Sequence, residues 1–490
     1  MLSPTLSSLI ARRAAEDPGH VLFEDARSDR VVTAGELKRL VAAWHERFAG
    51  AGLGPSAAVL IDTDDVLATT VLQLAVVSGG FRAITIDHGA SREEPARIAG
   101  LIRGAGMTVG DRGDDRAVPG APWTAVGADL APGEAGEGTP AAAAEPTGAG
   151  AAVLFTSGST GTPKGVELPE PQLLYVAARI ATHHGLGPGD RGFNPLPLSH
   201  VNPQVIGVLA TLVAGSTTVL DARFRRTGFW ELLHERRITW LNAVPAILAV
   251  LARTGELDPP ETLRFIRSAS APLPDHVREA FAGIPFILSW GMTEGASQIT
   301  ATDPQDAAEV RGVGRPQGGE VEVRSPEGER LTAGETGELW VRGEGIIRHY
   351  LFDAAADRFD DDGWLRTGDV GAIDGSGLVT LAGRSDDVIN RGGEKVYPID
   401  VEEVLLGDPH VLEAVVVGRP DDVLGQIPVA YVIPVDGAAV DVEALRERCE
   451  EQLARFKRPV EINLVAELPR APAGKIRRAE VRRMAAETPA

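Results

Sequence analysis

The stretch Ala152-Val153-Leu154-Phe155-Thr156-Ser157-Gly158-Ser159-Thr160-Gly161-Thr162-Pro163-Lys164-Gly165 joins a short apolar run to a loop rich in glycine and hydroxyl groups. The apolar run predicts a buried strand. In the loop, three glycines permit backbone conformations that let consecutive N–H groups turn toward one anion. Five hydroxyl groups and Lys164 add further polar contacts. The stretch therefore predicts a polyphosphate-binding loop, but not a Walker A loop, because Pro163 precedes the lysine and Gly165 follows it.

The residues around this stretch predict an α/β fold. Apolar runs rich in Val, Leu and Ile at 57–61 and 83–86 have the pattern of buried strands, and segments 34–50 and 71–79 have that of the intervening helices. This alternation favours mostly parallel sheets. Segment 129–150 is low-complexity Ala/Gly/Pro sequence, for which we expect an exposed loop.

The pattern of apolar and polar residues changes twice in the second half of the chain. After Gly319, segments 321–324 and 337–341 alternate between apolar and polar residues, as half-exposed antiparallel strands do. After Gly383, a separate small α/β pattern begins, with apolar runs at 414–417 and 429–433. We therefore predict an N-terminal domain at residues 1–383 and a C-terminal domain at residues 384–490, joined by a short hinge.

Composition limits the classes of function. The 490 residues carry a formal net charge of −21, which argues against nucleic acid or an anionic membrane as partner. Cys449 is the only cysteine, which excludes an intramolecular disulfide and suits a reducing cytoplasm. The N-terminus lacks the apolar region of a signal peptide. Polar residues interrupt the uncharged segment 201–220, so we expect a buried helix and strand there. These features predict a soluble cytoplasmic protein. We expect a monomer or a homodimer.

The loop at 156–165 resembles the signature loop of the adenylate-forming (ANL) superfamily, which includes acyl-CoA synthetases, adenylation domains of peptide synthetases and firefly-type luciferases. Further motifs extend the resemblance, in order, over nearly the whole chain. It implies a large N-terminal domain of α/β subdomains with a small β-barrel-like subdomain, and a small, mobile α+β C-terminal domain. It also implies ATP, Mg²⁺ and coenzyme A as cofactor and substrates.

The resemblance implies a nucleotide site built from three segments of the N-terminal domain. The phosphate loop binds the β- and γ-phosphates, Ser268–Leu273 resembles the segment that lines adenine, and Trp290–Glu294 resembles an aromatic-Gly-x-Thr-Glu motif. Trp290 replaces the tyrosine most often found there. Thr293 and Glu294 are implied catalytic residues, with Glu294 the Mg²⁺ ligand. The implied nucleotide contacts are Thr156, Ser157, Gly158, Ser159, Thr160, Gly161, Lys164, Ser270, Ala271, Pro272, Trp290, Gly291 and Met292.

Towards the C-terminus, the resemblance assigns Asp369 to the ribose hydroxyls, Arg384 to ribose or phosphate, and Asp386 to the hinge. Gly392, Gly393 and Glu394 resemble the loop that such enzymes bring to the active site for thioester formation. Lys475 matches the catalytic lysine, which holds the carboxylate and the α-phosphate together. The resemblance thus predicts a two-step reaction, acyl-AMP formation followed by attack of a thiol.

The acyl group is the least determined part. By the resemblance, His200 occupies the position next to the carboxylate of the acyl substrate. No acid–base role is assigned to it. No aspartate occurs in segment 198–202 to hold an ammonium group, which disfavours an α-amino acid. The predicted lining, including 205–207 and 243–245, is mainly apolar, so aliphatic, aromatic and alicyclic acids remain open.

The acceptor thiol has two candidates. Coenzyme A is the first, and the alternative is a separate carrier protein loaded by a stand-alone ligase. Residues 455–483 hold nine basic residues against three glutamates, an excess that suits either the phosphates of coenzyme A or an acidic carrier. A third hypothesis is a non-catalytic binding protein with this fold. Such a protein would have lost catalytic residues of the motifs. The sequence retains these residues, namely Lys164, Glu294, Asp369, Arg384 and Lys475.

Overall fold

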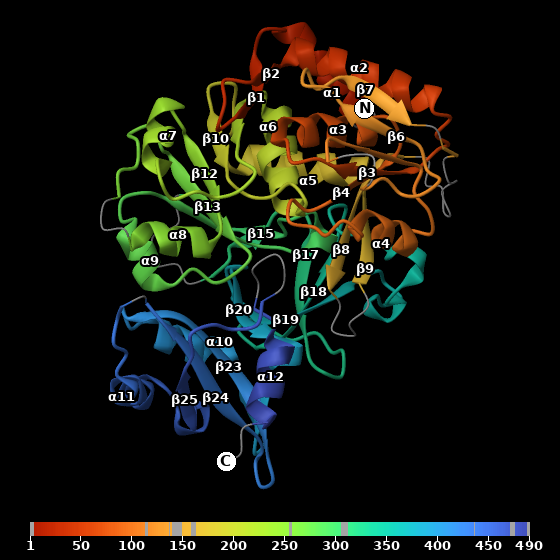
Figure 1. Cartoon of the computed structure of the whole chain (residues 1–490). Coiled ribbons are helices and arrows are strands. Elements are labelled where there is room, and N and C mark those ends of the chain that lie inside the picture. Colours follow the sequence, from red (N-terminus) through yellow and green to blue (C-terminus); the bar gives the residue numbers. More distant parts are fainter. Residues whose placement is uncertain are drawn as a thin grey trace. The chain divides into compact units, whose positions relative to one another are not determined.

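The computed structural model describes residues 4–112, 116–136, 138–139, 149–157, 163–253, 257–304, 312–435, 437–470 and 476–487. It divides into two compact units. The first comprises Met1–Ala271, Gly283–Glu320 and Val341–Leu365, and the second comprises Pro272–Ala282, Val321–Trp340 and Arg366–Ala490. Figure 1 shows the elements of both units in sequence colours.

The first unit contains a seven-stranded sheet in the order β7-β6-β5-β3-β4-β8-β9. Its inner strands pair in parallel, whereas β6–β7 and β8–β9 are antiparallel edge pairs. Its strands are β3 (Ala58–Asp62), β4 (Arg82–Thr85), β5 (Met107–Gly110), β6 (Trp123–Val126), β7 (Pro132–Gly136), β8 (Ala151–Ser157) and β9 (Pro163–Pro169), and its connecting helices are α2 (Ala34–Gly50), α3 (Val66–Ser78) and α4 (Glu94–Leu101).

A nine-stranded sheet of the same unit follows the order β16-β15-β14-β13-β12-β10-β11-β1-β2. Strands β14, β13, β12, β10, β11 and β1 are parallel, so their carboxyl ends share one edge. The strands are β1 (Val21–Asp25), β2 (Val31–Thr33), β10 (Arg191–Asn194), β11 (Thr217–Leu220), β12 (Trp240–Ala243), β13 (Phe265–Ala269), β14 (Phe286–Trp290), β15 (Thr300–Ala301) and β16 (Arg315–Pro316).

The remaining helices of the first unit are α1 (Leu6–Glu16), α5 (Glu170–His183), η2 (Pro203–Leu209), α6 (Ala210–Ala214), α7 (Phe229–Glu235), α8 (Pro245–Ala252), η3 (Thr293–Gly295), η4 (Leu351–Asp353) and η5 (Ala356–Arg358). Helix α3 is buried from Val66 to Val77 and is predominantly apolar around its circumference, as a helix enclosed by the core requires. Helix α2 starts at a Thr33 N-cap, whose hydroxyl accepts from the Glu36 N–H.

The second unit contains a four-stranded sheet of β17 (Glu320–Arg324), β18 (Gly337–Arg342), β19 (Leu365–Ile373) and β20 (Val379–Arg384), in that order. A further sheet has the order β22-β21-β24-β23, with β25 on β24. Its strands are β21 (Ile389–Arg391), β22 (Glu394–Val396), β23 (Val411–Asp421), β24 (Gly425–Pro434) and β25 (Glu461–Leu464), and the unit's helices are α9 (Asp275–Ala280), η6 (Ser385–Asp387), α10 (Pro398–Leu406), α11 (Val442–Gln452), η7 (Arg455–Lys457) and α12 (Arg478–Glu487). Helix α12 packs on β23 (Figure 1).

Most of the predicted elements are confirmed, and two are corrected. The helix predicted at 34–50 is α2, and segment 201–220 forms η2, α6 and β11. The exposed loop predicted at 129–150 is wrong for Pro132–Gly136, because these residues pair with β6 as an exposed edge strand. The predicted phosphate loop is also shorter, since its ends belong to β8 and β9.

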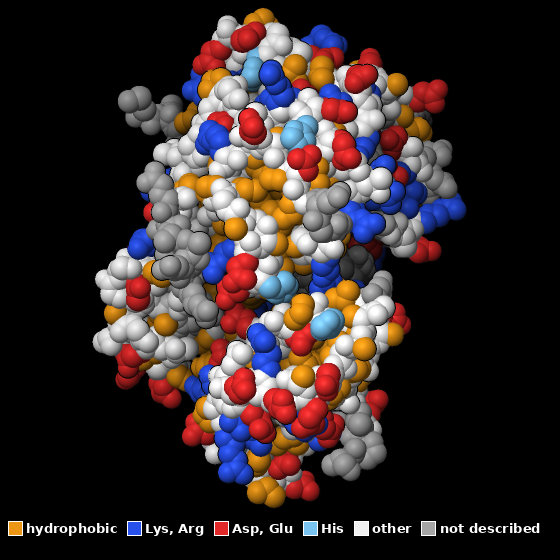
Figure 2. Space-filling model, turned by 90° about the vertical axis from the view of Figure 1, so that its left-hand side faces the viewer, with side chains coloured by type: hydrophobic (Ala, Val, Ile, Leu, Met, Phe, Trp, Pro, Cys, Tyr) orange, Lys and Arg blue, Asp and Glu red, His pale blue; other side chains and the backbone are white. Residues whose placement is uncertain are grey.

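Two further features concern the length of the helices and the distribution of surface charge. Within the described part of the chain, every helix is too short or too polar to cross a membrane. On the face in Figure 2, acidic and basic side chains are interspersed. The net negative charge is therefore not gathered into one acidic field on that face.

Candidate active site

The two ends of the predicted phosphate loop belong to paired strands. Strands β8 and β9 pair antiparallel, with Thr156 opposite Lys164. Residues 158–162, which include the predicted contacts Gly158, Ser159, Thr160 and Gly161, lie outside the described residues. A Cβ on Gly165 would stand 2.8 Å from Cδ1 of Leu351, so glycine there lets the η4 segment approach β9.

Tyr350 connects the phosphate loop to the predicted magnesium ligand. Its ring centroid lies 5.8 Å from Nζ of Lys164, within the range of a cation–π contact. Its hydroxyl donates to Oε1 of Glu294 at 2.7 Å and accepts from Nη1 of Arg358 at 2.8 Å. Tyr350 is 1% exposed. Sequence reasoning missed both Tyr350 and Arg358, because an isolated Tyr or Arg in a polar segment carries no motif.

Glu294 is held in place by its backbone as well as by its side chain. The residue is 4% exposed and lies in the short η3 turn. Its carbonyl oxygen accepts from the Ile347 N–H at 2.9 Å and from Nε2 of Gln172 at 3.3 Å. Nη1 of Arg358 lies 3.5 Å from the same oxygen, Oε1, that Tyr350 binds.

This arrangement fits a magnesium ion bound largely through nucleotide phosphates. Among the described residues, no group of three or more His, Cys, Asp or Glu side chains is arranged to hold a metal ion. Mg²⁺ commonly binds proteins through one or two carboxylates, with substrate phosphates and water completing the octahedron. Glu294, fixed through Oε1 by Tyr350, suits that role.

The two predicted adenine segments follow neighbouring strands. Strand β13 ends at Ala269 and pairs in parallel with β14, which ends at Trp290. Ser270 then adopts φ = 79°, a left-handed conformation that turns the chain sharply after the strand. A Cβ on Gly291 would stand 1.8 Å from the Ser297 carbonyl oxygen, so only glycine fits there. The parallel pairing thus brings the Ser270–Ala271 and Trp290–Met292 segments to one sheet edge.

His200 lies at the surface, in a polar region that includes Ser199 and Asp87. Its side chain is exposed, and the preceding Ser199 donates to Oδ2 of Asp87 at 2.7 Å. Burial alone raises the pKa of Asp87, but the Ser199 and Gly89 hydrogen bonds and the neighbouring His200 and His88 together lower it. A carboxylate therefore stands close to the residue predicted to lie beside the acyl carboxylate.

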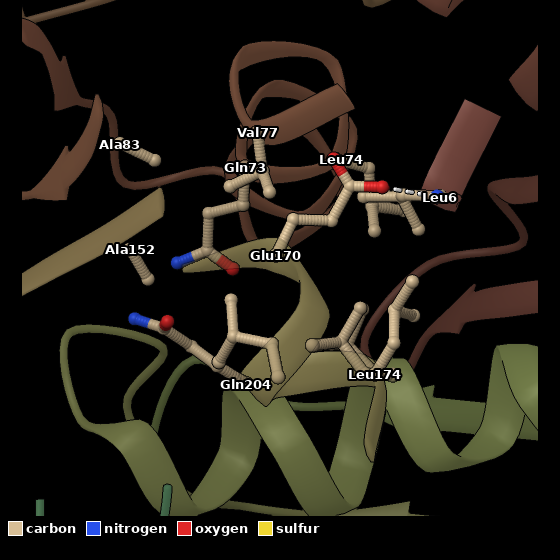
Figure 3. Close-up of a pocket in the computed structure, with 12 residues that line it drawn as sticks. Leu6, Gln73, Leu74, Val77, Ala83, Ala152, Glu170, Leu174 and Gln204 are labelled. Atoms are coloured by element: carbon tan, nitrogen blue, oxygen red, sulfur yellow. Dashed lines mark hydrogen bonds between the residues drawn. The ribbon is translucent and has the colours of Figure 1, made fainter. Parts of the chain in front are cut away.

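An apolar cavity lies elsewhere in the first unit. It is lined by Leu6, Gln73, Leu74, Val77, Ala83, Ala152, Glu170, Leu173, Leu174, Gln204, Val208 and Leu209. Figure 3 shows the amides of Gln73 and Gln204 facing this space, whereas the Glu170 carboxylate bonds the Leu6 N–H. The predicted acyl-lining residues 205–207 and 243–245 are not among its lining, although Gln204, Val208 and Leu209 of the same η2 helix are.

In the second unit, Asp369 and Arg384 are cross-strand partners. They face each other in the β19–β20 pair, and Nη1 of Arg384 donates to Oδ1 of Asp369 at 2.9 Å. The structure thus joins two residues that sequence analysis assigned separately to the ribose and to ribose or phosphate.

The predicted thioester loop is a hairpin. Strands β21 and β22 pair with Arg391 opposite Glu394, and Gly392 and Gly393 form the two-residue turn with φ of 59° and 92°. Positive φ at both turn positions is the requirement of a type I′ hairpin. The Asp386 carbonyl oxygen accepts from Nη2 of Arg482 at 2.8 Å, which ties the predicted hinge residue to α12.

Lys475 lies outside the described residues, as do 471–474. The residues that flank this segment pair with each other, because Arg470 and Ile476 form an antiparallel bridge. Helix α12 follows and is anchored by Arg478, which contacts both carboxylate oxygens of Glu402 at 2.7 and 2.8 Å.

Comparison with known proteins identifies the family. Residues 10–351 match the model of the AMP-binding enzyme family, and residues 400–475 match its C-terminal domain. The chain belongs to the AMP-binding enzyme family. It is 35% identical to a sulfoacetate–CoA ligase of Cupriavidus necator over 97% of this chain and 96% of that one. It is 33% identical to an indoleacetate–CoA ligase of Aromatoleum aromaticum over 68% and 67%.

Among solved structures, the o-succinylbenzoate CoA synthetase of Bacillus subtilis in complex with its acyl-adenylate superposes with a TM-score of 0.85. It is 27% identical, and the match covers 98% of both chains. The predicted superfamily, the ANL fold and the acid–thiol ligase class are therefore confirmed. The predicted ATP, Mg²⁺ and coenzyme A agree with these AMP-binding relatives, since the Bacillus subtilis enzyme has also been solved with ATP and magnesium ion.

The basic excess at 455–483 is largely neutralised within this AMP-binding enzyme. Six of its nine basic residues form ion pairs. The pairs are Lys457–Asp400, Arg470–Glu413, Arg477–Glu480, Arg478–Glu402, Arg482–Asp387 and Arg483–Glu480. Most of the excess charge is therefore paired within the second unit and is weak support for binding either coenzyme A or a carrier protein.

Proposed function

We propose that this chain activates a non-amino-acid carboxylic acid as its acyl-AMP, with release of pyrophosphate, and transfers the acyl group to the thiol of coenzyme A. The observation that carries the proposal is the position of Tyr350 between Lys164 and Glu294. Phosphoryl transfer depends on positioning and charge stabilisation. A lysine on the phosphate loop and a fixed carboxylate for Mg²⁺ supply both.

Each predicted residue has a role in this proposal. Lys164 and the loop donors hold the β- and γ-phosphates, and Lys475 holds the acid's carboxylate against the α-phosphate. Asp369 and Arg384 bind the ribose. Mg²⁺, held by Glu294, would neutralise charge as pyrophosphate leaves. His200 borders the acyl carboxylate, Thr293 lies beside Glu294, and Trp290 and Ser270–Pro272 hold adenine.

The second half-reaction calls for a different set of residues. We propose that Asp386 is the hinge between domains 1–383 and 384–490. The C-terminal domain would present Lys475 for adenylation and the Gly392–Glu394 turn for thioester formation. The single, buried cysteine is compatible with a cytoplasmic location.

A pyrophosphate-release assay over a panel of carboxylic acids tests the first step. We expect release with at least one acid, and Lys475→Ala should abolish acid-dependent ATP–pyrophosphate exchange while leaving the melting temperature unchanged. Intact exchange in that variant would refute the role of Lys475. Repeating the assay with coenzyme A and with carrier proteins tests the acceptor, and thioester formed on a carrier alone would refute the coenzyme A assignment.

A further inference from the structure

Arg267 is a fully buried cation in the middle of the nine-stranded sheet. It lies on β13 between β12 and β14 and is 0% exposed. Its Nη2 donates to Oγ of Ser289 at 2.6 Å and its Nη1 to Oδ1 of Asn242 at 3.4 Å, whereas Nε has no partner. A guanidinium has five N–H donors, and both acceptors here are neutral. Within the described residues, no carboxylate lies at ion-pair distance from Arg267.

Arg82 is a second buried arginine, and it has a carboxylate counterion. It is similarly inaccessible, on β4 of the other sheet, and it is paired with the buried Glu167. Nε and Nη2 of Arg82 each lie 3.0 Å from a different oxygen of that carboxylate. Burying a charge without a counterion is costly. Arg82 has its counterion within the chain, and Arg267 lacks one among the described residues.

The contacts of Arg267 place it between the segment predicted to lie beside the acyl carboxylate and a segment predicted to hold adenine. Nδ2 of Asn242 donates to Oδ1 of Asn202 at 2.9 Å, and Asn202 follows His200 closely in the chain. On the other side, Ser289 directly precedes Trp290. The polar row Asn202–Asn242–Arg267–Ser289 therefore joins the His200 segment to the Trp290 segment.

Two further buried polar side chains lie close to Arg267. One of them, His184, is 2% exposed. Burial, followed by the charges of Arg267 and His183, lowers the pKa of His184 well below its usual value, so its ring is neutral. Gln298, 3% exposed, lies beside this imidazole, and its hydrogen bond with His184 offsets part of that lowering. Burial also lowers the pKa of Arg267, to about 9. These groups form a desolvated, electropositive environment in which Nε of Arg267 is an unused donor.

We propose that Arg267 binds a second anionic group on the acyl substrate, a carboxylate or a sulfonate remote from the carboxylate that is activated. The inference rests on the proposed acyl-AMP-forming function. A guanidinium binds such oxyanions through two parallel hydrogen bonds, and Nε and Nη2 present one such edge. Family membership leaves this open, since sulfoacetate carries a second acidic group and indoleacetate does not.

The test compares matched acids in one enzyme preparation. Each pair consists of a dicarboxylic acid and its mono-amide, over a range of chain lengths, with a sulfonate analogue as a third arm. We expect the wild-type chain to favour the dianionic member by about 30-fold or more in kcat/KM for pyrophosphate release. The sulfonate arm decides which oxyanion is preferred. In Arg267→Met, we expect the preference to fall to within about threefold of unity, and Arg267→Lys should retain part of it.

Ratios within one variant cancel any loss of folded protein. Arg264→Met is the matched control, because Arg264 directly precedes β13, is 45% exposed and is paired with Asp190 at 2.6 Å. The preference of Arg264→Met for the dianionic acid over its mono-amide should equal that of the wild type. Equal use of both members by the wild type, or an unchanged ratio in Arg267→Met, would overturn the inference while leaving acyl-AMP formation established. If no acid released pyrophosphate, the proposed function itself would be refuted, and the inference with it.

Discussion

Nη1 of Arg384 donates to Oδ1 of Asp369 at 2.9 Å across the β19–β20 pair, which fixes the carboxylate by a charge-assisted hydrogen bond. The Asp369 side chain is 14% exposed and that of Arg384 50%. The ion pair thus orients the carboxylate that is predicted to bind the ribose hydroxyls.

Asp369→Asn should raise the KM for ATP by about tenfold or more, because a charged acceptor for the ribose is lost. The KM for the acid should change little. Steady-state pyrophosphate release with ATP and with 2′-deoxy-ATP measures this, and the penalty for the deoxy nucleotide should be smaller in the variant than in the wild type.

Glu338→Gln is the matched control for this prediction. Glu338 pairs with Arg366 at 2.7 Å in the same four-stranded sheet, with side-chain exposures of 13% and 51%. Both substitutions remove a cross-strand ion pair, but only Asp369→Asn should affect the KM for ATP. An equal effect of the two would assign Asp369 a structural role.

Tyr350→Phe should lower the rate of acid-dependent ATP–pyrophosphate exchange by about tenfold and raise the Mg²⁺ concentration needed for half-maximal rate. The reason is that Glu294 would lose its 2.7 Å hydrogen bond from the hydroxyl. Titration of the exchange rate with Mg²⁺ gives both quantities.

Tyr175→Phe removes a hydroxyl of the same kind, one that binds a backbone carbonyl instead of Glu294. That hydroxyl donates to the Gly318 carbonyl oxygen at 2.5 Å. The control should keep the wild-type Mg²⁺ dependence, and a Tyr350→Phe variant that also kept it would contradict the role assigned to Tyr350.

Cys449 should be unreactive in the folded chain. The thiol is 1% exposed, and burial, only partly offset by the charges of Arg448 and Arg458, raises its pKa to about 11. Thiolate is the reactive form, so at pH 8 both ionisation and access oppose modification. A disulfide reagent should titrate one thiol per chain in denaturant and almost none natively, and rapid native labelling would disprove the burial of Cys449.

Glu170→Gln should stabilise the chain at neutral and alkaline pH. Burial, partly offset by the hydrogen bond from the Leu6 N–H, raises the pKa of Glu170. Its ionised form is therefore less stable in the folded chain than in the unfolded one, and this cost develops as pH rises through the raised pKa. The variant should melt about 1–3 °C higher at pH 8 and gain nothing at pH 4. A gain at pH 4 as large as at pH 8 would contradict this account.

Local sequence determined much of the site. An apolar run followed by glycines and hydroxyls has few structural solutions, and the antiparallel pair of β8 and β9 is one of them. The Gly392–Gly393 turn was recognisable for the same reason, since positive φ at two successive positions strongly favours glycine. The edge strand Pro132–Gly136 was missed, because a sequence poor in β-branched and aromatic residues forms a strand only when a neighbour such as β6 pairs with it.

Arg82 and Arg267 illustrate what the sequence could not determine and the tertiary structure did. Each occurs in an apolar run, and from the sequence the two runs predict nothing different about their arginines. The counterion of Arg82, Glu167, is 85 positions away and meets it only because β4 and β9 both flank β8. The same long-range pairing places Asn242 and Ser289, both neutral, beside Arg267. Motif chemistry is local and could be read from the chain, whereas the partner of a buried charge depends on strand order.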